Sequence, residues 1–131
     1  MIFVDTGAWF ASMVPSDANH AAASQWLSQD QGPLITTDYV VSETLTLLVM
    51  RRQRLQAEAF GKAIFSGQLA QLHLLSEGDI RAAWDVFLKY GDKQWSFTDC
   101  TSKVVIEKLR IASAFSFDHH FRQFGTVAVV P

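Results

Sequence analysis

Short apolar stretches alternate with longer segments of helical periodicity along the whole chain, and this alternation constrains the fold more than any other sequence feature. The short stretches have the length of buried strands, whereas the longer segments repeat apolar residues at helical spacing. This alternation predicts an α/β domain with a mainly parallel sheet. The expected strands are 2–5, 33–37, 69–76, 112–117 and 126–130, and the expected helices are 17–29, 38–53, 55–66, 77–91 and 98–110, with a short helix or turn at 118–125.

The size and composition of the chain favour a single folded unit. The chain has 131 residues, of which 49% are hydrophobic and 18% charged, which is enough apolar material for a core and argues against disorder. No internal repeat, low-complexity tract or long Pro/Gly/Ser linker divides it. We therefore expect one domain over residues 1–131.

The sequence carries no sign of export or of membrane insertion. The lone Cys100 cannot form an internal disulfide, which fits a reducing compartment. The first ten residues lack the basic start of a signal peptide, and no segment reaches the roughly 20 apolar residues of a membrane span. We therefore expect a cytoplasmic protein without a membrane partner. The net charge of −2 argues against nucleic-acid binding unless a local basic patch or a bound cation reverses it.

Acidic residues follow two of the expected strands. Asp5 comes directly after the stretch Ile-Phe-Val, and Asp118 comes directly after Ala-Phe-Ser-Phe. In a parallel sheet both acids leave at the carboxyl edge, where α/β proteins bind their ligands. Asp99 opens a helix after a loop and can face the same edge, with nearby backbone N–H groups favouring its ionised form.

Glu43 stands in the middle of the apolar run Val-Val-Ser-Glu-Thr-Leu-Thr-Leu-Leu. Residues three or four apart share a helix face, so Val40 and Leu47 flank Glu43 and the face that buries them also turns this carboxylate inward. A buried carboxylate without a partner costs several kcal/mol or takes up a proton. Either Glu43 lies at the solvent end of its helix, or it faces something positive.

A divalent cation shared by Asp5, Glu43, Asp99 and Asp118 is a good positive partner. Hard oxygen ligands without His or Cys spacing indicate Mg²⁺ or Mn²⁺, and such an ion keeps open positions for phosphate. Taken singly, an Asp at a strand end is more often a cap or a turn former. The combination of these acids is more specific than any one of them.

These residues resemble the PIN-domain family, and in particular the VapC-type toxins of bacterial toxin–antitoxin pairs. The resemblance runs nearly end to end and rests on four motifs. They are IFVDTGAWFA with Asp5 and Thr6, VVSETLTLL with Glu43, DKQWSFTDCTSKVVIEKL with Thr98 and Asp99, and IASAFSFDHHFRQFG with Asp118.

The resemblance implies a three-layer α/β/α fold with strand order 3-2-1-4-5 and an Mg²⁺- or Mn²⁺-dependent endoribonuclease. It also implies inhibition by a cognate antitoxin and frequent homodimers. Asp5 and Asp99 are then the expected direct metal ligands, and Glu43 and Asp118 ligate directly, act through water or orient the attacking water. Thr6 and Thr98 would support the carboxylates or a metal-bound water, although Thr98 can equally be only a helix N-cap.

Other side chains have plainer expected roles. Arg51, Arg52 and Arg54 are the densest basic cluster, for which a solvated helix end is favoured over contact with an RNA backbone. We expect His119 and His120 to be surface residues at a helix start and Cys100 to pack in the core. Four aromatic residues are expected in the core or at an interface: Trp9, Phe10, Trp26 and Trp84.

Two alternatives belong to other functional classes. The first is a non-catalytic PIN-like module that binds RNA or protein, which the four retained acids disfavour. The second is a phosphohydrolase or phosphoacceptor domain. The phosphatase version usually needs a second acid two residues after the first, whereas here Asp5 is followed by Thr6 and Gly7.

Overall fold

A five-stranded parallel sheet forms the centre of the computed structural model, which describes residues 1–131. The strand order is β3-β2-β1-β4-β5, and every neighbouring pair is parallel, as expected. The strands are β1 (Ile2–Val4), β2 (Leu34–Thr37), β3 (Gln71–His73), β4 (Ser113–Phe115) and β5 (Ala128–Val130).

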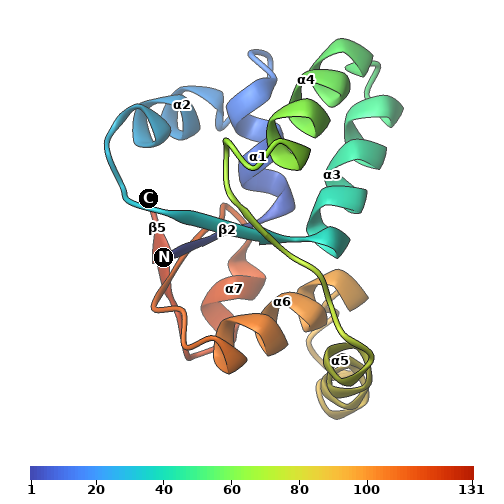
Figure 1. Ribbon diagram of the computed structural model, residues 1–131. Helices are drawn as coiled ribbons and strands as arrows, with labels where there is room; N and C mark the ends of the chain where they lie inside the picture. Colours follow the sequence, from blue (N-terminus) through green and yellow to red (C-terminus); the bar gives the residue numbers. More distant parts are fainter.

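Helices cover both faces of this sheet, which gives the expected three layers (Figure 1). On one face lie α1 (Thr6–Met13), α2 (His20–Ser28), α3 (Asp38–Met50) and α4 (Arg54–Phe65). On the other lie α5 (Glu77–Lys89), α6 (Phe97–Lys108) and the short α7 (His119–Gln123). No helix combines the length and the apolar character that a bilayer crossing requires.

Helix α1 is absent from the elements expected from the sequence. It begins directly after Asp5, so no turn residues separate it from β1. It is held by burial: Trp9 packs against Phe60 with ring centroids 5.4 Å apart and donates from its indole N–H to Thr36 Oγ1 at 3.3 Å. Asp5 stands at the N-cap but its side chain makes no capping hydrogen bond, so tertiary packing holds this helix in place of a local cap.

Helix α6 begins earlier than expected, which changes the role of Thr98. The Ser96 hydroxyl accepts the backbone N–H of Asp99, and the Asp99 carboxylate accepts the backbone N–H of Ser96, both at 3.0 Å. This reciprocal pair is a capping box, so the N-cap of α6 is Ser96 and the assignment of Thr98 as N-cap is wrong.

Three of the four aromatic residues expected in the core or at an interface lie in the core. Trp9, Phe10 and Trp26 are buried, and Trp26 lies against Phe115 with ring centroids 4.1 Å apart. Trp84 on α5 is 51% exposed, so of its two expected places only an interface remains. Its ring stacks on Phe87 of the same helix, at 5.7 Å.

Candidate active site

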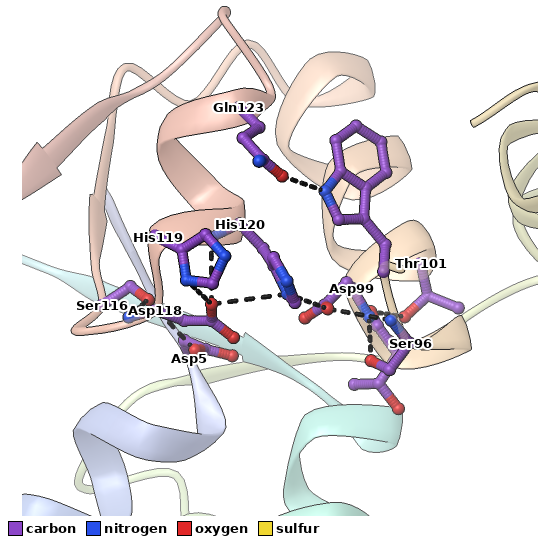
Figure 2. A network of polar contacts seen from close by, with 11 residues as sticks. Asp5, Ser96, Asp99, Thr101, Ser116, Asp118, His119, His120 and Gln123 are labelled. Carbon is purple, nitrogen blue, oxygen red and sulfur yellow. Dashed lines mark hydrogen bonds and ion pairs between the residues drawn. The ribbon is translucent and has the colours of Figure 1, made fainter. Parts of the chain in front are cut away.

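The topology brings Asp5 and Asp118 to one edge of the sheet. Strands β1 and β4 are neighbours, with Val4 opposite Phe115, and each acid follows the carboxyl end of one of them. The backbone N–H of Asp5 donates to the carbonyl of Phe115 at 3.1 Å, which continues the pairing one step beyond the strands. The parallel register therefore places these two carboxylates side by side (Figure 2).

Ser116 links the two acids, and the sequence reasoning missed it. Its hydroxyl donates to Asp5 Oδ2 at 3.1 Å and accepts the backbone N–H of Asp118 at 3.0 Å. Ser116 is buried at 3% exposure, where a hydroxyl needs partners. The only signal in the sequence is a polar residue between Phe115 and Phe117, two positions before Asp118.

Asp99 approaches from the start of α6. The capping box fixes its carboxylate at the helix N-terminus, and the residue is 8% exposed. Its charge and that of Asp118 both act on Asp5, which shows that the three aspartates share one electrostatic environment. Thr98 is half-buried, and its hydroxyl bonds to none of these carboxylates.

Burial disfavours the ionised form of Asp5. It raises the pKa of Asp5 from the ordinary 3.8 to about 7, and the negative charges of Asp99 and Asp118 add to this. The backbone N–H of Thr6 and the Ser116 hydroxyl act in the opposite direction but do not compensate. A nearby cation would favour the ionised form of Asp5.

His120 lies between the other two carboxylates (Figure 2). Its Nδ1 is 3.1 Å from Asp99 Oδ2 and 3.4 Å from Asp118 Oδ1. The surface prediction is correct for His119, whose side chain is 76% exposed, and wrong for His120, whose side chain is 19% exposed. The reason is that Asp118 caps α7, and this short turn directs His120 back over α6.

Glu43 does not point into the core, so that expectation is wrong. The buried face of α3 carries Val40, Thr44 and Leu48, whereas Glu43 is exposed. Leu47, one turn further along α3, lines a groove together with Asp118. Glu43 itself does not line that groove, and its charge is not among those that act on the pKa of Asp5, so its part in the site stays a prediction.

The donor set fits a hard divalent cation. Three aspartates offer oxygen ligands at one sheet edge, and Thr6 Oγ1 beside Asp5 is buried without any hydrogen-bond partner. Asp118, His119 and His120 also bring potential ligand atoms within 4.8 Å of one another. No Lys or Arg pairs with Asp5, Asp99 or Asp118, and the only basic side chains that contact them are the imidazoles of His119 and His120.

Cys100, next to Asp99, is poorly suited to act as a nucleophile. It is 1% exposed, and burial together with the Asp99 charge raises the pKa of its thiol to about 11. A thiol with this pKa stays protonated and is a poor nucleophile. Its expected role in core packing is confirmed.

Comparisons with known proteins identify the family and agree with the fold. The sequence matches the PIN domain family over residues 2–127. The 23S rRNA-specific endonuclease VapC20 of Mycobacterium tuberculosis is 32% identical over 131 residues, covering 100% of this chain and 99% of that protein. Ribonuclease VapC26 of the same organism is 26% identical, covering 99% of this chain and 100% of that protein. The crystal structure of VapC20, a sarcin–ricin loop cleaving toxin, matches with a TM-score of 0.91 over 100% of both chains.

Proposed function

Because this chain belongs to the PIN domain family, we propose that it is an endoribonuclease that hydrolyses RNA phosphodiester bonds with the help of Mg²⁺ or Mn²⁺. The observation that carries the proposal is the convergence of Asp5, Asp99 and Asp118 at one sheet edge without a Lys or Arg partner. Such a cluster is unfavourable alone and suits a divalent cation that also contacts phosphate.

The relatives indicate the substrate and the biological setting. VapC20 is a 23S rRNA-specific endonuclease and a sarcin–ricin loop cleaving toxin. We take 23S rRNA as the first substrate to test for this chain. A toxin of this kind would act in a type II toxin–antitoxin pair, with a cognate antitoxin and a second copy of the chain as protein partners.

The metal would be held by Asp5, Asp99 and Asp118, with Glu43 directly or through water. Thr6 Oγ1, buried and unpartnered beside Asp5, is free to hydrogen-bond a ligand there. When bound, the cation supplies Lewis acidity that lowers the pKa of water and offsets charge that develops on the phosphate.

The chain's own side chains fix the geometry of this site. Ser116 sets the separation of Asp5 and Asp118, and the capping box with Ser96 holds Asp99 on a rigid helix start. His120 keeps Asp99 and Asp118 together. Glu43, exposed on α3, would orient the attacking water.

The test is RNA cleavage by wild-type protein and by Asp5→Asn, with Mg²⁺, with Mn²⁺ and with chelator. Asp5→Asn keeps the size of a side chain whose neutral form burial already favours, so the variant is expected to fold. Its cleavage rate should fall on the order of 10³-fold, because the interactions of a catalytic metal are worth several kcal/mol. Asp92→Asn, in an exposed loop pair with Lys93, is the matched control and should cleave normally.

Cleavage by Asp5→Asn at the wild-type rate would overturn the proposal. Cleavage that persists with chelator would remove its metal dependence. RNA binding without any cleavage by wild-type protein would instead favour the non-catalytic binding module.

A further inference from the structure

A groove of about 290 Å³ opens beside the carboxylates. Its walls come from four parts of the chain: α1, the segment between α1 and α2, the C-terminal end of α3 and the segment after β4. They contribute Gly7 and Phe10, Asp17 and Asn19, Leu47 and Arg51, and Phe117 and Asp118. The groove therefore joins one of the acidic site residues to a basic side chain at the end of α3.

Arg51 is the basic end of this groove and has no acidic partner. Its guanidinium carbon lies 6.0 Å from the centre of the Phe10 ring, which forms part of the same wall. Arg54, three residues later, pairs with Glu58 at 3.6 Å and lines a different groove, between α3 and α4. A guanidinium held over an aromatic face keeps its N–H donors free for an anion.

One acid besides Asp118 lines the groove. Asp17 accepts the backbone N–H of Asn19 through Oδ2 at 3.0 Å, and it makes no ion pair with Arg51. Its charge opposes an anion in the groove, so neutralising it should favour one. Gly7 forms an open part of the wall, because a Cβ placed there meets nothing within 4 Å.

We propose that this groove is a phosphate-binding subsite for the RNA strand, in which Arg51 holds the phosphate of a nucleotide next to the one that is cut. This rests on the proposed function for the identity of the strand. An RNA strand with one phosphate at the carboxylate end carries the next phosphates along the groove, where Arg51 offers charge-assisted, bidentate hydrogen bonds.

A simpler role for Arg51 is to complement the macrodipole at the C-terminus of α3. Its backbone N–H closes the helix by donating to Leu47 at 3.0 Å, so the charge is well placed for that. The dipole alone predicts a contribution to stability and none to RNA affinity. The two roles are therefore separable by measurement.

The experiment measures RNA binding in the Asp5→Asn background, which prevents cleavage. The probe is a fluorescein-labelled RNA hairpin that carries the sarcin–ricin loop, followed by anisotropy over a salt series. Arg51→Ala should weaken binding roughly tenfold and reduce the salt slope by about 1, as expected for one lost phosphate contact. Arg54→Ala, which removes an equal charge outside the groove, should stay within about twofold.

Two further variants test the groove itself. Asp17→Asn keeps the oxygen that accepts the Asn19 N–H and should tighten binding, because it removes a negative charge from the wall. Gly7→Leu should weaken binding by filling the groove from a position with room for a side chain. In the cleaving protein, Arg51→Ala should raise KM and leave kcat within about twofold.

Equal affinities for Arg51→Ala and Arg54→Ala, or an unchanged salt slope for Arg51→Ala, would overturn the subsite. If wild-type protein cleaves RNA in that case, the proposed function still stands. If wild-type protein does not cleave but Arg51→Ala still loses affinity selectively, the subsite stands and the catalytic proposal fails.

Discussion

Two helix starts in this protein are built from the same local motif and have different electrostatic surroundings. Helix α5 begins with Ser76 and Asp79, and α6 begins with Ser96 and Asp99, each pair forming a capping box with bonds of 3.0–3.1 Å. Each aspartate also meets a histidine, His73 at 3.3 Å and His120 at 3.1 Å. Up to this point the two sites are alike.

The difference lies in what faces the second carboxylate oxygen. Asp79 Oδ1 meets the Lys108 ammonium at 2.8 Å. Burial acts to raise the pKa of Asp79, but hydrogen bonds from Lys108, from the Ser76 N–H and from His73 outweigh it and lower the pKa. Asp99 faces Asp5 and Asp118 instead, and it forms no ion pair with a Lys or Arg.

This contrast separates a structural carboxylate from a site carboxylate. The motif sets where the side chain points in both cases. The residues that pack against the carboxylate from other parts of the chain determine its role. Asp79 links α5 to the end of α6 through Lys108, whereas Asp99 has no Lys or Arg partner. Similar hydrogen bonding therefore gives different chemistry because the balancing charge differs.

The largest expected effect is on RNA cleavage, which should depend on Asp99 of the α6 capping box and not on Asp79 of the α5 capping box. Asp99→Asn keeps an acceptor for the Ser96 N–H but removes the charge, so cleavage should fall on the order of 10³-fold and Mg²⁺ affinity, measured by calorimetry, at least about tenfold. Asp79→Asn should cleave within about threefold of wild type below its unfolding temperature. Similar losses in both variants would mean that the contrast is wrong.

The next effect concerns the pH dependence of stability without metal. The pKa of Asp5 is raised from 3.8 to about 7 on folding, so its contribution is fully present below pH 3.8 and is lost as pH rises through 7. The free energy of unfolding by urea should fall by about 3 kcal/mol between pH 5 and pH 8. Asp5→Asn should remove this fall, and added Mg²⁺ should reduce it at pH 8. A wild-type stability that is flat over this range would contradict the assignment.

The smallest expected effect concerns the capping box of α5, in which Asp79 pairs with Lys108. Lys108→Met removes the cation from a buried Asp79, but Lys108 is half exposed and solvent screens the pair, so the loss should be about 1–2 kcal/mol at pH 7. Because folding lowers the pKa of Asp79, this carboxylate stabilises the fold at pH values above its ordinary pKa, and the stabilisation is lost as the pH falls below about 4. The free energy of unfolding of the variant should therefore fall less on acidification than that of the wild type. Arg81→Met, which breaks an exposed pair on α5, is the control and should cost less than about 0.5 kcal/mol. Equal losses for the two variants would show that the pair between Lys108 and Asp79 contributes no more than an exposed ion pair.

The sequence predicted the parts of the site that depend on strand ends. Asp5 and Asp118 follow from the parallel sheet, and Asp99 follows from a helix start. Ser116 and His120 could not be predicted in the same way, because a serine between phenylalanines and a histidine in a turn have many possible partners. Glu43 was placed on the wrong face, because the exposed side of α3 also carries apolar residues such as Val49 and Met50.

Periodicity and chain order alone determined the parallel α/β sheet and the edge at which its acids emerge, because both follow from strand direction and local alternation. Only the tertiary structure decided that α1 forms directly after β1, that Lys108 reaches Asp79, and that no comparable cation reaches Asp99. These outcomes depend on contacts between residues far apart in the chain. Local sequence fixes the direction of a side chain, whereas the charge that it meets is fixed by packing.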